Sequence, residues 1–158
     1  MRTVWRRLQQ QNYLAAIRNS LGSRQYQDVW LENDTQCVNV TEAGIISCAW
    51  YASSLLVLHG VLQSVHGTVE GTEWELRERC DLLPAPYSAL QPGDILLWEA
   101  VHFPNGGRHA HIGFFVGEEQ AISNSARTRV PALHHWTYEG TRAITAVYRP
   151  RWEQPQSR

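Results

Sequence analysis

A cysteine and a histidine, far apart in the sequence, are the two side chains best suited to act together chemically. Cys48 begins an apolar stretch of helical length, and His111 begins a strand-like run of apolar residues over 111–117. A cysteine attacks as the thiolate, which the partial positive charge of a helix N-terminus and a nearby imidazole both favour. The pair therefore indicates a thiol hydrolase, with Cys48 as nucleophile and His111 as general base, if folding brings them together.

The elements that must position this pair run from helices to strands. Apolar positions at helical spacing predict one helix or two over 3–21, and Glu and Arg placed for the helix dipole predict another over 72–80. Between them we expect a buried helix that Ser47 caps and that ends near Gly60. After the Pro92-Gly93 turn we expect strands over 94–98, 111–116, 121–124 and 143–148. Helices followed by strands predict an α+β domain.

Length and composition set the class of protein. The chain has 158 residues, 43% of them hydrophobic and 18% charged, which fits one globular domain, 1–158. A helical prelude would occupy 1–33, and a flexible tail would follow from residue 153 to 158. The formal charge of −1 offers no broad basic field, so we expect no nucleic-acid partner.

The first residues and the apolar stretch 43–62 are considered as a signal peptide and as a membrane span. A polar run over 8–12 follows the first residues instead of an apolar segment, so we see no signal peptide and expect synthesis in the cytoplasm. Residues 43–62 carry no Asp, Glu, Lys or Arg and match a membrane span in length. Ser, His and Gly positions interrupt them, so we interpret the stretch as a buried central helix, with no membrane span.

Three blocks in this order resemble the CHAP amidohydrolase/peptidase family and its NlpC-type relatives. They are Cys-Ala-Trp-Tyr-Ala at 48–52, Leu-Gln-Pro-Gly-Asp and the following apolar residues at 90–98, and His-Ile-Gly-Phe-Phe-Val-Gly at 111–117. The resemblance covers about 36–148. It implies a papain-like fold, in which N-terminal helices precede a central nucleophile-bearing helix packed on an antiparallel sheet. It also implies a cysteine hydrolase that needs no cofactor.

For the site, the resemblance implies Cys48 as nucleophile, His111 as base and a third polar residue that orients the imidazole. The third residue should lie on the strand after the 117–119 turn, and its identity depends on register. We favour Asn124, whose amide oxygen is a fixed acceptor, with Ser123 as the alternative that the commonest NlpC spacing selects. Ser47 departs from the Gln or Asp that members of the two groups carry before the nucleophile.

Other cysteines and aromatic residues admit competing interpretations. Cys37 follows Gln36 and is a rival nucleophile, and whether Cys37 pairs with Cys80 stays open, with two small buried thiols as the favoured reading. Trp50, His109 and His135 are candidates for the substrate cleft. Five histidines suggest a metal site, but no carboxylate or cysteine lies at ligand spacing, so we expect no metal: His102, His109, His111, His134 and His135.

The function expected from this resemblance is cleavage of an amide bond in the peptide part of bacterial peptidoglycan. Two alternatives stay open: a thiol amidase, deamidase or acyltransferase acting on a protein or small amide, and an inactive binding module of the same fold. We expect delivery to the wall by a phage or a specialised secretion apparatus. The bond cut, the oligomeric state and any inhibitor or delivery partner stay open.

Overall fold

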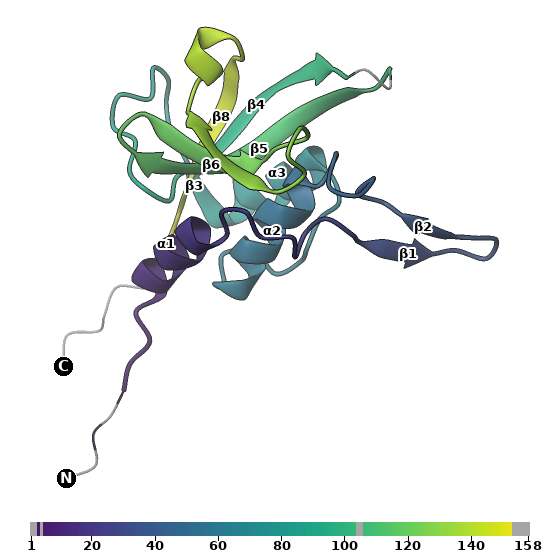
Figure 1. The fold of residues 1–158 in the computed structure, drawn as a ribbon. Coiled ribbons are helices and arrows are strands. Elements are labelled where there is room, and N and C mark those ends of the chain that lie inside the picture. The colour runs from purple at the N-terminus through teal and green to yellow at the C-terminus, as the bar shows by residue number, and fades with distance from the viewer. Residues whose placement is uncertain (1–2, 4, 104–105, 153–158) are drawn as a thin grey trace.

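Helices cover one face of an antiparallel sheet in this chain (Figure 1). The computed structural model describes residues 3, 5–103 and 106–152. Within them the helices are α1 (Gln9–Asn19), α2 (Cys48–Leu58) and α3 (Val69–Arg79). The main sheet has the strand order β3-β8-β4-β5-β6-β7, formed by β3 (Cys80–Leu82), β4 (Ile95–His102), β5 (Arg108–Gly117), β6 (Gln120–Asn124), β7 (Pro131–His135) and β8 (Ile144–Pro150). The predicted α+β class is confirmed.

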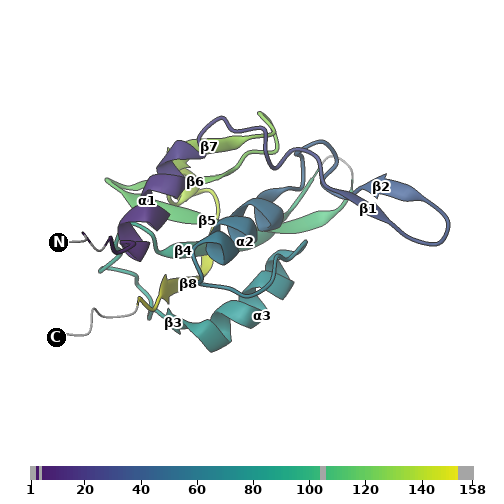
Figure 2. The same ribbon diagram turned by 90° about the horizontal axis from the view of Figure 1, so that it is seen from below.

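The helix-side core joins α1 and α2 to the centre of the sheet. Figure 2 looks onto this side, where α2 lies between α1 and α3. The rings of Tyr13 and Tyr51 meet Phe114 of β5 edge to face, with centroids 5.9 and 5.7 Å apart. All three residues are buried. Because α2 is apolar nearly all round, it occupies the middle of this layer, as expected for a buried central helix.

A second cluster of apolar residues covers the opposite face of the sheet. Its buried members are Leu96, Trp98, Phe115, Ala121 and Val147, and side chains from the loops and the short helix η1 (Tyr138–Gly140) pack against them. Trp98 of β4 lies directly opposite His111 of β5, so the two side chains share this face. The imidazole therefore lies on the side of the sheet that the helices do not cover.

The Gln-Pro-Gly-Asp turn precedes β4 and is held by contacts with β8 and with α1. Asp94 is buried, accepts the Gln91 N–H at 2.7 Å, and binds Arg149 of β8 through both carboxylate oxygens at 2.7 Å. Gly93 has a φ of 97°, and a Cβ there would lie 3.0 Å from Tyr13 and Leu14 of α1. The turn thus fixes α1 against the start of β4, and Asp94 is a structural residue of that turn.

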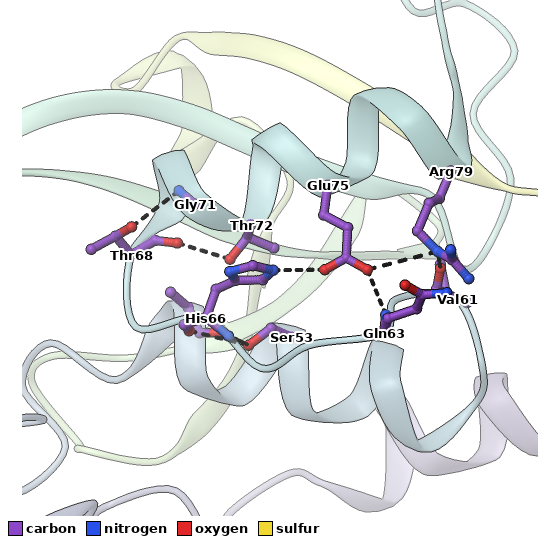
Figure 3. A network of polar contacts seen from close by, with 10 residues as sticks. Ser53, Val61, Gln63, His66, Thr68, Gly71, Thr72, Glu75 and Arg79 are labelled. Carbon is purple, nitrogen blue, oxygen red and sulfur yellow. Dashed lines mark hydrogen bonds and ion pairs between the residues drawn. The ribbon is translucent and has the colours of Figure 1, made fainter. Parts of the chain in front are cut away.

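A buried carboxylate holds the connection between α2 and α3 (Figure 3). Glu75 of α3 accepts the Gln63 N–H and lies 2.7 Å from His66 Nε2. The His66 N–H in turn donates to Ser53 Oγ of α2 at 2.9 Å. The helix itself begins at Val69 rather than Thr72, because the Thr68 side chain accepts the Gly71 N–H and so caps it earlier.

Other boundaries differ from the predictions. Helix α1 covers Gln9–Asn19 of the predicted 3–21; Trp5 is 91% exposed, and residue 4 lies outside the described residues. Ser47 precedes α2 but does not cap it, since its hydroxyl donates to the Tyr26 carbonyl. Strands β3 and β7 were not predicted. Neither were β1 (Trp30–Glu32) and β2 (Cys37–Asn39), a hairpin that projects from the body (Figures 1 and 2).

Two further predictions concern the C-terminal tail and the apolar stretch 43–62. The predicted flexible tail over 153–158 lies outside the described residues. The helix that covers most of 43–62, α2, has 11 residues. Among the residues that are described, no helix has the length and apolar character to cross a membrane.

Candidate active site

Cys48 is the first residue of α2, and its sulfur lies against the β5 backbone. Sγ is 4.0 Å from the Ala110 carbonyl oxygen, and the Ile112 N–H is close enough to favour the thiolate. The pairing of β5 with β6 ends at Gly113 and Ser123. Within the described residues, the edge of β5 that precedes Gly113 therefore has no strand beside it there, and the start of α2 lies against it. The thiol thus lies beside the backbone on both sides of His111, and the start of α2 points its free N–H groups at the same point.

His111 is buried, and Ser123 holds its ring. His111 Nε2 lies 2.8 Å from Ser123 Oγ on the neighbouring strand β6. Trp98 packs against the imidazole at 5.5 Å between centroids. Strand β5 begins at Arg108, so His111 lies inside the strand rather than at its start. These contacts fix both the position and the rotation of the imidazole.

The chain of polar contacts continues beyond Ser123. His134 Nε2 of β7 lies 2.8 Å from Ser123 Oγ, and the Tyr138 hydroxyl lies 3.2 Å from the same oxygen. His134 Nδ1 faces its neighbour's backbone, the His135 carbonyl oxygen, at 2.8 Å. The His134 and Tyr138 rings stack with centroids 4.2 Å apart. Four side chains from β5, β6, β7 and η1 therefore form one network behind the imidazole.

Arg142 supplies a positive charge near this network. Its Nε donates to the Glu99 carbonyl at 3.0 Å, and one terminal nitrogen donates to the His109 carbonyl at 2.9 Å. The guanidinium carbon lies 5.9 Å from the centre of the Tyr138 ring, within the range of a cation–π contact. Two backbone carbonyls and one aromatic face thus hold the cation, which is half-buried.

Burial and Arg142 act on the protonation of the pair. Burial raises the pKa of Cys48, while the N–H groups of Ile112, Ala49 and Cys48 itself and the charge of Arg142 oppose the rise in part. Burial, then Arg142 and His134, hold the pKa of His111 well below its ordinary value. At neutral pH the pair therefore rests as a thiol and a neutral imidazole, not as an ion pair.

Asn124 does not contact His111, so the favoured choice of orienting residue was wrong and the alternative, Ser123, takes that position. The Asn124 amide donates to the Gly44 carbonyl at 2.8 Å. The reason is a register shift. Gly117 lies opposite Gln120, and regular pairing from there would set Gly113 opposite Asn124. An irregularity between Phe115 and Gly117 moves the pairing by one residue, which turns Ser123 to the face of His111.

The candidate cleft residues lie apart from this network. Trp50 is half-buried, with its ring against Gly67, and His109 packs its ring edge to face on Phe103. His135 Nδ1 accepts the Thr137 N–H at 3.2 Å. Only the backbone carbonyl of His135 belongs to the network described above.

The remaining cysteines are both free. Cys37 lies exposed in β2 of the projecting hairpin, and Cys80 is buried at the start of β3. The favoured reading of two buried thiols therefore holds for Cys80 and is wrong for Cys37, because the hairpin packs on no other element at that point. Among the described side chains, no group of three His, Cys, Asp or Glu residues gathers as a metal site would require.

The sequence analysis missed Tyr138 and Arg142, and it considered His134 as a metal ligand or as part of a cleft or surface loop but not as a partner of Ser123. No spacing rule links these residues to His111, since they come from β7, η1 and the segment before β8. The signal available was the clustering of His134, Trp136, Tyr138 and Arg142 soon after the three resembling blocks.

Comparisons with models of known protein families and with curated proteins find no match to this chain.

Proposed function

We propose that this protein is a papain-like cysteine peptidase or amidase that cleaves an amide bond in the peptide part of bacterial peptidoglycan. One observation carries the chemical part of the proposal: a thiol at a helix N-terminus lies against the backbone of the strand segment that bears His111, and Ser123 contacts Nε2 of that histidine. The substrate class comes from the resemblance of the three sequence blocks to the CHAP and NlpC-type enzymes.

The reaction proceeds through an acyl enzyme. His111 Nδ1 takes the proton from Cys48 Sγ as the sulfur attacks the carbonyl carbon of the substrate amide. The imidazolium then gives this proton to the leaving amine nitrogen as the carbon–nitrogen bond breaks. Water attacks the thioester after losing a proton to His111, and Cys48 leaves as the thiol when that proton returns.

The oxyanion of each tetrahedral intermediate needs donors near Cys48. The N–H groups of Cys48 and Ala49 point toward the sulfur closely enough to favour its thiolate. Both belong to the first turn of α2, where backbone N–H groups have no partner within the helix. They are therefore the donors that we assign to the oxyanion.

A neutral resting pair favours attack coupled to proton transfer over attack by a preformed thiolate. The same burial that raises the pKa of Cys48 also supports the second candidate, a binding module of this fold with an inert thiol. The two candidates differ in whether Cys48 is consumed and restored during turnover.

The test is digestion of purified sacculi from several wall chemotypes with the wild-type protein and with Cys48→Ala. We expect release of soluble fragments whose new amino and carboxyl termini, read by mass spectrometry, lie within the stem or cross-bridge peptide. Cys48→Ala should release none, while Cys37→Ser, which changes an exposed thiol outside the site, should match the wild type.

Other outcomes would select the alternatives. Binding of sacculi without cleavage, equal for wild type and Cys48→Ala, would support the inactive module. Trapping of Cys48 as an acyl enzyme by a protein or small-amide substrate, with intact sacculi, would support the thiol amidase or acyltransferase.

A further inference from the structure

We propose that His134 is a positioning residue that acts through Ser123 to keep the proton of His111 on Nε2, so that Nδ1 stays free to accept the thiol proton. The inference rests on the proposed function for its catalytic consequence. Its structural part, the location of a proton on His111, depends only on the hydrogen bonds of the network.

The positions of the protons in this network follow from the His135 carbonyl oxygen, which can only accept a hydrogen bond. The His135 carbonyl lies 2.8 Å from His134 Nδ1, so Nδ1 must carry the proton. Nε2 of the neutral His134 ring is then an acceptor, and its partner at 2.8 Å, Ser123, must donate to it. Because a hydroxyl has a single proton, Ser123 has none left for its other neighbours.

Both other neighbours of Ser123 must therefore be donors. His111 Nε2 at 2.8 Å and the Tyr138 hydroxyl at 3.2 Å give their protons to Ser123 Oγ. With Nε2 protonated in a neutral ring, His111 Nδ1 holds a lone pair. The base thus starts each turnover in the tautomer that can receive a proton from Cys48.

Protonation of His134 reverses this order. An imidazolium donates from both nitrogens, so His134 Nε2–H would donate to Ser123 and free the hydroxyl proton for His111 Nε2, at 2.8 Å, in preference to the more distant Tyr138 oxygen, at 3.2 Å. His111 would then accept at Nε2 and carry its own proton on Nδ1, where it could not take the proton of the thiol. His134 is in this way an acid-sensitive switch on the general base.

Several charged and titratable groups face His134. Arg142 and His135 act on its charge, Tyr138 of η1 stacks on its ring, and His111 of β5 lies across Ser123. Burial, together with Arg142 and His135, lowers the pKa of His134, while the hydrogen bond to the His135 carbonyl opposes the shift in part. The switch therefore operates below the ordinary histidine value, about 6.5.

The first experiment reads the tautomer without any substrate. In protein labelled with 15N at histidine, the Nδ1 and Nε2 shifts of His111 report which nitrogen carries the proton. We expect the Nε2–H form alone in the wild type at neutral pH. In His134→Leu, which removes the acceptor for Ser123, we expect a mixture of both forms. An unchanged His111 tautomer in His134→Leu would overturn the inference.

The second experiment compares pH profiles of turnover. His134→Leu should lower kcat by about 10²-fold, the lower end of what a positioned proton-transfer group contributes. His134→Gln keeps an acceptor oxygen but cannot be protonated, so kcat should recover most of this loss and the acid limb should move to lower pH. His102→Gln removes an exposed imidazole at the end of β4 and should leave the profile unchanged.

The outcomes separate this inference from the proposed function. If the wild type cleaves no amide substrate but the tautomer depends on His134, the function fails and the network stands. If the wild type is active and the acid limb of His134→Gln does not move, the switch is wrong and the function stands. Circular dichroism of each variant identifies any loss that comes from unfolding.

Discussion

Gly113 of β5 lies directly opposite Ser123 of β6, and the missing side chain at Gly113 makes room for Ser123. A Cβ at Gly113 would lie 2.6 Å from Ser123 Cβ and 2.6 Å from the Ile122 carbonyl oxygen. Neither atom can move without separating the two strands. The glycine in the third resembling block is thus explained by packing, since the close strand pair sets the contact between Ser123 and His111.

Gly113→Ala should weaken both folding and catalysis. The added methyl group forces β5 and β6 apart, at a cost of about 1–3 kcal/mol for overpacking, and moves Ser123 away from His111. We expect a lower free energy of unfolding in urea and a fall in kcat/KM measured under conditions where the variant is folded. Wild-type activity in the folded variant would show that the Ser123 contact does not matter for the reaction.

The two candidates for the orienting residue give opposite predictions. Ser123→Ala removes the partner of His111 Nε2, so kcat per folded molecule should fall by about 10²-fold or more, and the buried groups left unpaired should also lower the stability. Asn124→Ala leaves the Gly44 carbonyl without its donor, so it should destabilise the fold by about 1–3 kcal/mol while kcat per folded molecule stays near wild type. A fall in kcat per folded molecule for Asn124→Ala but not for Ser123→Ala would restore Asn124 to the site.

This choice between neighbours shows where prediction from sequence ends. Apolar runs and turn residues predicted α2, β4, β5, β6 and β8, because each pattern reports the local burial of its own segment. The face on which Ser123 lies depends instead on the irregularity between Phe115 and Gly117, which no pattern in β6 encodes.

The network behind His111 was unpredictable for a related reason. His134 reaches Ser123 because β7 pairs with β6, with Ser123 opposite Ala132 and Ala121 opposite His134. Strand β7 begins with a proline and lacks a clear alternation of apolar residues, so neither the strand nor its pairing was apparent. Side chains that meet across three strands are set by the sheet, not by spacing in the chain.

Arg142 should tune the ionisation of Cys48. Its charge favours the thiolate, so Arg142→Gln should raise the pKa of Cys48 further and also release His111 from part of the repulsion that lowers its pKa. We expect the alkylation of Cys48 by iodoacetamide, followed by mass spectrometry in a Cys37→Ser background, to shift to higher pH. Arg108→Gln, which changes an exposed arginine at the start of β5, is the matched control. An identical alkylation profile for Arg142→Gln and the control would remove Arg142 from the site.

The carboxylate of Glu75 should make the stability of the fold depend on acid pH. Burial alone would raise the pKa of Glu75, but hydrogen bonds from the Gln63 N–H, His66 and the Ser64 N–H outweigh it and hold the pKa below its ordinary value. A group with a lowered pKa in the folded state stabilises the fold above its unfolded pKa, about 4.3, and this contribution is lost as the pH falls through the folded pKa. Glu75→Gln should therefore cost about 1–2 kcal/mol at neutral pH, and the difference from wild type should shrink below about pH 4.

Urea unfolding at a series of pH values measures this difference. Glu70→Gln changes an exposed carboxylate in the first turn of the same helix and should show no such dependence on pH beyond that of the wild type. The Glu75 network fastens α3 to the loop that follows α2 (Figure 3). A Glu75→Gln variant whose stability deficit stayed constant down to pH 3 would show that the carboxylate charge does not stabilise this connection.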